Sequence, residues 1–236
     1  MTSPPLQSYV FILILPVKRM AKMKKKHPIE ALIEQGEHQQ LDFKFEVSDS
    51  KKIARTLSAF ANTDGGRLLI GVKDNGNISG VRSEEEYYMI EAASKMYTRP
   101  EVPFEATRWE VNGKTVLEIY IAPSPDRPYL APDKDDKFKA YIRVKDENIL
   151  ASEVLVLAWR KKHEPDGTLL KISRPVERLF AYLEIHPYIN ISQFCRVGRV
   201  NHYAAKHIIS DLLAIDALQY TVVDKHILYR RVIPTE

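Results

Sequence analysis

Three acidic residues and one lysine lie near the ends of two predicted strands, in the order Glu37, Asp42, Lys44 and Asp74. Asp42 and Lys44 share the polar face of the alternating segment 41–47, and Asp74 follows the apolar segment 67–72. Carboxylates gathered from adjacent strand ends can bind Mg²⁺ or Mn²⁺ through oxygen. Such an ion polarises a phosphodiester and activates water, while a nearby lysine stabilises the developing charge. The pattern therefore leaves a metal-dependent nuclease open.

The same residues also have an ordinary structural interpretation. Asp74 suits a hairpin turn, Glu37 suits a helix end, and Asp42 with Lys44 suits an exposed ion pair. For any single residue the structural role is the safer prediction. Only the combination supports a metal site.

A second pattern, in a predicted strand, favours nucleic-acid binding. Every second residue is basic or aromatic, in the order Lys137, Lys139, Tyr141, Arg143 and Lys145. Side chains alternate along a strand, so all five share one face. Four cations around one aromatic ring suit phosphates and a stacked base. The alternative is a solvated outer sheet face, which would more often carry both signs of charge.

A third pattern lies near the C-terminus, where segment 175–185, segment 191–197 and a segment capped by Asn201 are predicted helices. Two β-rich runs follow, separated by Asp224 and Lys225. Three helices and a hairpin are typical of a winged helix-turn-helix. Its predicted nucleic-acid-binding residues are Arg199, His202, Tyr203, Lys206, Lys225 and Arg230. A winged helix used for protein contact is the alternative.

The remaining pattern predicts an α+β protein. Helices are expected over 27–35, from Ser50 to Asn62, over 84–97 and over 152–162, and strands over 41–47, 67–72, on both sides of Asn112-Gly113 and over 137–145. Ser83 and Glu86 form a predicted capping box. The polar segment 163–167 suggests a boundary between a first domain at 28–162 and a winged helix at 168–233.

Residues 1–27 are predicted to be a disordered tail or the result of a start codon assigned too early, with translation from Met20 or Met23. Their apolar run, 9–17, is too short to span a bilayer, so no membrane partner is expected. The single cysteine, Cys195, excludes an internal disulfide and favours a reducing, cytoplasmic setting. The seven histidines have no zinc spacing. No nucleotide P-loop occurs, and Gly65-Gly66 follows a helix rather than opening one.

Four segments together resemble the AlbA_2 domain of Schlafen proteins and of bacterial proteins classed as transcriptional regulators. They are GEHQQLDFK (36–44), AFANTDGGRLLIGVKDNGNISGV (59–81), APSPDRPYL (122–130) and AYIRV (140–144). The resemblance covers about residues 28–162. It implies an AlbA_2/Schlafen-like mixed sheet with helices that binds nucleic acid, often followed by a winged helix.

The resemblance also implies a possible activity. Some Schlafen proteins are metal-dependent endoribonucleases whose acidic triad corresponds here to Glu37, Asp42 and Asp74. Asp42 stands where that triad has a second glutamate, so its carboxylate has a shorter reach. Schlafen cores pair two related lobes and this chain has one, so a homodimer would be needed to form a comparable groove.

Three hypotheses follow from the sequence. The first is a DNA-binding transcriptional regulator. The second is an endonuclease acting on structured RNA, with Mg²⁺ or Mn²⁺ held by Glu37, Asp42 and Asp74 and assisted by Lys44; apart from that ion no cofactor is predicted. The third is a winged-helix scaffold for protein partners. The first is preferred, and its expected partners are DNA, or RNA, and a second copy of the chain.

Overall fold

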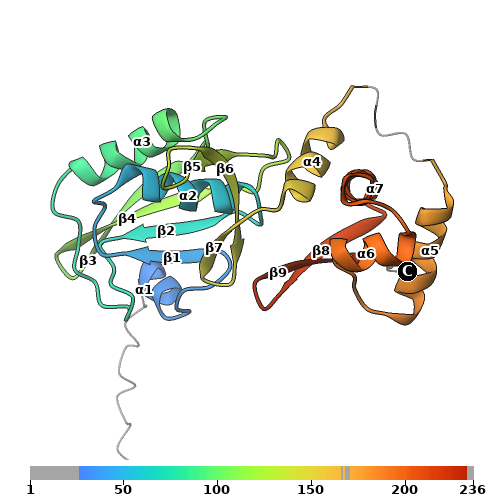
Figure 1. Ribbon diagram of the computed structural model, residues 1–236. Coiled ribbons are helices and arrows are strands. Elements are labelled where there is room, and N and C mark those ends of the chain that lie inside the picture. The colour runs from blue at the N-terminus through green and yellow to red at the C-terminus, as the bar shows by residue number, and fades with distance from the viewer. Residues whose placement is uncertain (1–26, 166, 168–170, 233–236) are drawn as a thin grey trace, which may run out of the picture.

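The computed structural model describes residues 27–165, 167 and 171–232, and the predicted tail lies outside them except for His27. The first part of the chain is built on a four-stranded sheet in the order β1-β2-β4-β3. The strands are β1 (Leu41–Lys44), β2 (Gly66–Ile70), β3 (Glu105–Val111) and β4 (Lys114–Ile121). β1 and β2 are parallel, and the other neighbours are antiparallel. The mixed α+β class predicted from the sequence is therefore confirmed (Figure 1).

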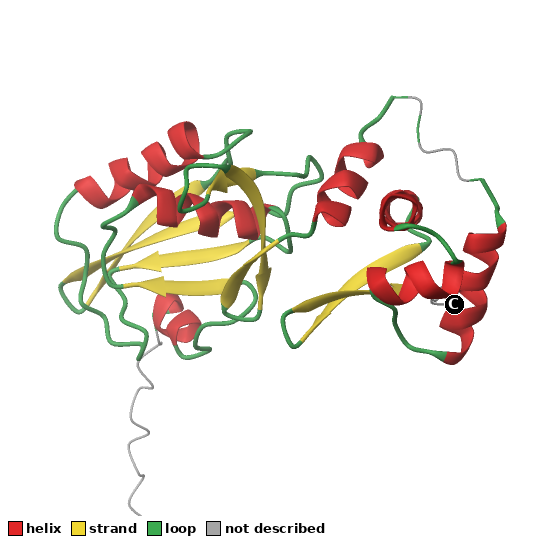
Figure 2. Ribbon diagram, viewed as in Figure 1, coloured by secondary structure: helices red, strands yellow, loops and turns green. Residues whose placement is uncertain are grey.

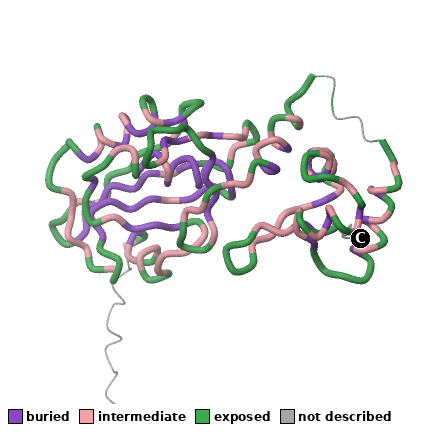
Figure 3. Tube along the Cα trace, in the orientation of Figure 1, coloured by how far each residue is buried: buried purple, intermediate pink, exposed green. Residues whose placement is uncertain are grey.

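Helices cover both faces of this sheet (Figure 1). Helices α2 (Ser50–Ala61) and α3 (Glu85–Tyr97) pack on one face, where Phe60, Leu68 and Ile119 belong to one buried cluster. Helix α1 (Pro28–Ile33) covers the other face with Ile29. The central strands are buried along their length (Figure 3). Burial on both faces explains why β2 is almost entirely apolar.

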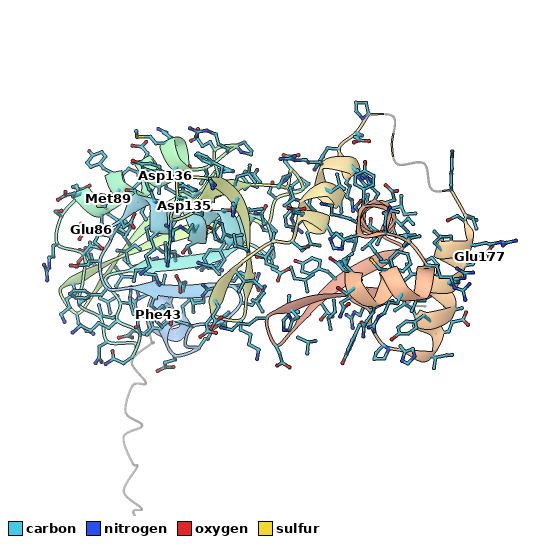
Figure 4. The ribbon with its side chains drawn as sticks, in the orientation of Figure 1. Phe43, Glu86, Met89, Asp135, Asp136 and Glu177 are labelled. Atoms are coloured by element: carbon cyan, nitrogen blue, oxygen red, sulfur yellow. The ribbon has the colours of Figure 1, made fainter. Side chains whose placement is uncertain are left out.

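Local signals set several of these boundaries. The side chain of Asp49, not of Ser50, accepts the backbone N–H groups that begin α2. At the start of α3 Glu86 accepts the N–H groups of Arg82 and Ser83, which is one half of the predicted capping box (Figure 4). Ser83 Oγ accepts the N–H of Glu85 rather than that of Glu86. Asn112 and Gly113 both have positive φ, which a two-residue hairpin between β3 and β4 needs.

The Asn-Thr-Asp-Gly-Gly corner that ends α2 positions the strands around it. Asn62 is fully buried; its amide donates to the carbonyls of Tyr129 and Tyr141, and its Oδ1 accepts the N–H of Tyr129, all within 2.9 Å. A Cβ on Gly65 would lie 2.6 Å from a carbonyl oxygen of β4, so no larger residue fits there. The predicted role of this corner in ending a helix is confirmed.

A second, three-stranded sheet lies beside the first, in the order β5-β6-β7. Its strands are β5 (Leu130–Pro132), β6 (Phe138–Val144) and β7 (Glu147–Leu150), of which only β6 is predicted from the sequence. The N-terminal end of β6 pairs with β5 and its C-terminal end with β7. Helix α2 packs against β6, which buries Tyr141 in the cluster that also holds Phe60.

The C-terminal part consists of helices α5 (Arg174–Ile185), α6 (Ile191–Gly198) and α7 (His202–Ala214) and the hairpin β8 (Leu218–Val223) and β9 (His226–Arg231). The helices surround one end of the hairpin (Figure 2). Asp224 and Lys225 both have positive φ at its turn. Asn190 and Asn201 cap α6 and α7 with hydrogen bonds of 2.8 Å.

Helix α4 (Glu153–Lys162) packs against α7, although the sequence pattern assigns it to the first domain. Leu155 and Ala158 belong to the same buried cluster as Leu179, and Ile142 of β6 extends this cluster toward the first sheet. Among the described residues, none of the helices has the length and apolar character needed to cross a membrane.

Candidate nucleic-acid interface and acidic cluster

Asp42 is enclosed by basic side chains. It is 3 % exposed, and its Oδ1 lies 3.1 Å from the Nη2 of Arg143, which is also buried. Lys44 Nζ lies 2.8 Å from Oδ2, without the alignment of a hydrogen bond. The expectation that Asp42 and Lys44 form an exposed pair on a polar strand face is wrong for Asp42, because β6 covers that face.

Arg143 on β6 lies 101 residues after Asp42 in the sequence. Its Nη2 also donates to the Leu41 carbonyl, its Nη1 donates to Asn148 Oδ1, and its guanidinium lies 5.2 Å from the Phe60 ring centroid. The Nε of Arg143 has no partner among the described residues. A charge this deeply buried is tolerated when it is paired and hydrogen-bonded, so the Asp42–Arg143 pair is a structural link between β1 and β6.

Glu37 is half-buried beside this pair. Its Oε1 accepts the Phe43 N–H at 2.9 Å. Burial raises the pKa of Glu37 above its ordinary value, the Phe43 hydrogen bond lowers it, and the neighbouring Asp42 carboxylate raises it further. The structure therefore brings Glu37, Asp42 and Lys44 together, as the sequence pattern suggested.

Asp74 lies apart from this group in an exposed turn. The turn is closed by hydrogen bonds from Gly76 N to Lys73 O and from Lys73 N to Asn77 O. Across residues 27–165 and 171–232, no three His, Cys, Asp or Glu side chains are grouped so that they could hold a metal ion. In this arrangement the acidic residues do not fit Mg²⁺ or Mn²⁺, because Asp42 is already paired with two cations, Arg143 and Lys44.

The basic strand is split by burial. Lys137, Lys139 and Lys145 are exposed, whereas Tyr141 and Arg143 are 8 % and 2 % exposed. Only Lys139, Tyr141 and Arg143 alternate along β6, since Lys137 precedes the strand and Lys145 lies in the turn after it with φ +58°. Helix α2 and β1 cover Tyr141 and Arg143, so these two residues offer no surface to a nucleic acid in this structure. Lys139 Nζ is also 3.3 Å from Asp133. Of the five predicted binding residues of this segment, only the three lysines are exposed to solvent.

The start of α7 carries the most open group of the predicted binding residues. Arg196 and Arg199 precede it, His202 and Tyr203 begin it, and all four are exposed, Tyr203 by 69 %. Arg199 has φ +56°, which turns the chain between α6 and α7. The Tyr203 ring lies 4.4 Å from the ring of His207 one turn later. Aromatic and cationic groups thus share one end of one helix.

Two other predicted binding residues are paired within the chain. Lys206 on α7 bonds to Glu153 at the start of α4, and Lys225 at the tip of the β8–β9 hairpin is 2.7 Å from Glu147 on β7. Arg230 on β9 is exposed. The two glutamates are absent from the sequence predictions, because they lie 53 or more residues from their partners and no local pattern connects them.

Comparison with known families gives one match: residues 37–152 fit the model of the family described as Schlafen, AlbA_2. The matching region, called the AlbA_2 domain below, ends where α4 begins. The comparison with curated proteins gave no match.

Two solved structures are similar to parts of the chain. The crystal structure of the DIP2311 protein from Corynebacterium diphtheriae has 20 % identity and a TM-score of 0.41, over 62 % of this chain and 28 % of that one. The solution structure of the N-terminal domain of a putative ATP-dependent DNA helicase RecG-related protein from Nitrosomonas europaea has 22 % identity and a TM-score of 0.34. That similarity covers 54 % of this chain and 92 % of that one. This chain thus aligns with only a small part of DIP2311.

Proposed function

We propose that the protein binds duplex DNA through helices α5 to α7 and the β8–β9 hairpin, arranged as a winged helix-turn-helix, and acts as a transcriptional regulator. One observation carries this proposal: exposed Arg196 and Arg199 precede α7, and exposed His202 and Tyr203 begin it, so cationic and aromatic side chains gather where that helix starts. In a helix-turn-helix that end of the second helix enters the major groove.

Each residue has a distinct proposed role. Tyr203 and His202 lie at the exposed N-terminal turn and would contact base edges. Arg199 before the helix and Arg230 on the hairpin would contact phosphates and set the orientation on the duplex. The match to the AlbA_2 family supports a nucleic-acid-related role of the whole chain.

The AlbA_2 domain adds a second basic surface in this proposal. Lys137, Lys139 and Lys145 would contact the phosphate backbone without sequence preference. Two copies of the chain would present two such surfaces and two helices α7, as a symmetric DNA site requires. A homodimer in the cytoplasm is part of the same proposal.

The metal-dependent endonuclease remains a second hypothesis. In its favour, the carboxyl groups of Glu37 and Asp42 lie beside each other with Lys44. Against it, Asp42 is committed to Arg143, and Asp74 is exposed in a turn of its own. No catalytic step follows from this arrangement.

Binding of labelled duplex DNA, single-stranded DNA and transfer RNA, with Mn²⁺ or with chelator, separates these functions. The variant Arg199→Asn removes a charge and keeps a residue type that tolerates positive φ, so it preserves the turn. We expect Arg199→Asn to weaken duplex binding and to lower the salt slope by about 0.9. Lys52→Gln, an exposed charge on α2, is the control and should change neither.

Each outcome bears on one of these functions. Equal binding of duplex DNA by Arg199→Asn and the parent protein would contradict the proposed interface. Cleavage of transfer RNA that needs Mn²⁺ and is lost in Glu37→Gln, with unchanged thermal stability, would establish the nuclease instead, because glutamine can still accept the Phe43 N–H. Absence of all nucleic-acid binding would favour a winged helix that contacts proteins.

A further inference from the structure

A cavity of about 650 Å³ lies where α4 and α7 meet β8 and the loop that follows β4. This volume is in the range of small-molecule sites, which often lie where two domains meet. The loop contributes Ser124, Pro125 and Arg127, so both parts of the chain form its walls. None of the predicted nucleic-acid-binding residues lines it.

One side of the cavity is apolar and aromatic. Leu155 and Leu218 are almost completely buried, and beside them Trp159 and Tyr220 are only half-buried. Burial raises the pKa of Tyr220, and the nearby Arg127 guanidinium opposes that effect while Asp64 adds to it. A planar apolar group can therefore pack against these rings while a polar group reaches the hydroxyl of Tyr220.

The other side carries a net positive charge. Lys162 and Asp216 both line the cavity and neutralise each other at 2.7 Å. Arg127 donates to the backbone carbonyls of Ser124 and Thr63, which fix its guanidinium. Within the described residues Arg127 has no carboxylate partner at ion-pair distance, and His163 at the end of α4 adds no negative charge. An immobilised, uncompensated guanidinium favours an anionic group.

We propose that this cavity binds a small aromatic anion, with the ring against Trp159 and Tyr220 and the anionic group on Arg127. Nucleoside monophosphates and aromatic carboxylates share this chemistry. The binding needs no DNA, so it stands or falls independently of the function proposed above.

Tryptophan fluorescence tests the proposal in the full chain. The sequence has two tryptophans, and Trp109→Phe leaves Trp159 as the only reporter. AMP and benzoate are the two anionic probes, and adenosine and benzamide are their uncharged counterparts. We expect a saturable change in Trp159 fluorescence with at least one anion, at an affinity about tenfold or more above that of its uncharged counterpart, because a charge-assisted hydrogen bond is lost.

Arg127→Gln should remove this preference for the anion. Arg99→Gln is the matched control, because Arg99 also donates to two backbone carbonyls but does not line the cavity. Saturation by AMP alone identifies a nucleotide site, and saturation by benzoate alone identifies a carboxylate site. No response to either anion, or equal affinity for the charged and uncharged probes, overturns the proposal even if Arg127→Gln fails to fold.

Discussion

Glu153→Gln should strengthen DNA binding, because Glu153 holds a lysine of the proposed interface. Glu153 is 84 % exposed at the start of α4, whereas its partner Lys206 on α7 is 24 % exposed. The Lys206 hydrogen bond holds the pKa of Glu153 below its ordinary value, so the carboxylate is ionised at neutral pH. The negative charge of Glu153, beside His202 and Lys206, repels phosphates. Its ion pair with the ammonium group of Lys206 also competes with a phosphate contact. Glutamine keeps the size of the side chain and removes that charge.

The magnitude follows from counterion release. One additional phosphate contact steepens the dependence of log K on log salt by about 0.9. Between about 50 and 200 mM salt, a fourfold change, the affinity of Glu153→Gln should fall about 3.5-fold more than that of the parent protein. The gain in affinity is largest at low salt, where the electrostatic contribution is least screened.

Fluorescence anisotropy of a labelled duplex over this salt range measures the effect. In a Lys206→Gln background Glu153→Gln should change the slope little, because the freed cation is absent. Glu91→Gln is the matched control, since Glu91 pairs with Lys95 at 2.6 Å on α3 of the AlbA_2 domain. An unchanged slope in Glu153→Gln, or the same gain in Glu91→Gln, would refute the assignment of Lys206 to the DNA-binding face.

Three further predictions concern stability. Arg143→Met should lower the free energy of unfolding in urea by about 3–5 kcal/mol, because it leaves the buried Asp42 with only the partly exposed Lys44 as a cationic partner, and adding Asp42→Asn should recover part of that loss; an unchanged midpoint in the single variant contradicts this. Asn62→Ala should lower the free energy of unfolding by about 1–3 kcal/mol for each buried carbonyl left unpaired, and thermal unfolding measures this loss. Burial raises the pKa of Tyr229, so its stabilising contribution is complete below the ordinary tyrosine value of about 10 and is lost as pH rises through the folded-state pKa. Tyr229→Phe should therefore lose less stability than the parent protein in alkaline urea titrations, and parallel curves would contradict this.

Local sequence signals predicted much of the backbone. The helix cap at Asn201, the hairpin at Asn112-Gly113 and the end of α2 all depend on residues within a few positions of each other. Such signals act through hydrogen bonds and φ preferences that need no distant partner. The short strands β5 and β7 lack them, because three or four residues give too little alternation to recognise.

The candidate site was predicted less well for a physical reason. Alternation placed Asp42 and Phe43 on opposite faces of β1 but could not show that both faces are covered. The cover on the Asp42 side is Arg143, 101 residues later. In β6 the same alternation placed Tyr141 and Arg143 with three lysines, yet packing against α2 and β1 turned two of the five residues into core. Periodicity identifies a shared face, and only tertiary contacts decide what lies against it.

The ion pairs of Lys206 and Lys225 connect the proposed DNA-binding face to the rest of the chain. Lys225 pairs with Glu147 at the start of β7, and Lys206 pairs with Glu153 at the start of α4, the helix that packs against α7. Phosphates that bind these lysines must displace Glu153 and Glu147. By linkage, any ligand that favours the state with these ion pairs broken raises the affinity for DNA. Bound DNA then raises the affinity for that ligand by the same factor. The cavity beside Trp159 lies against the same helix α4, so its occupant and DNA act on one structural element, and measuring each affinity in the presence of the other gives the size and the sign of their coupling.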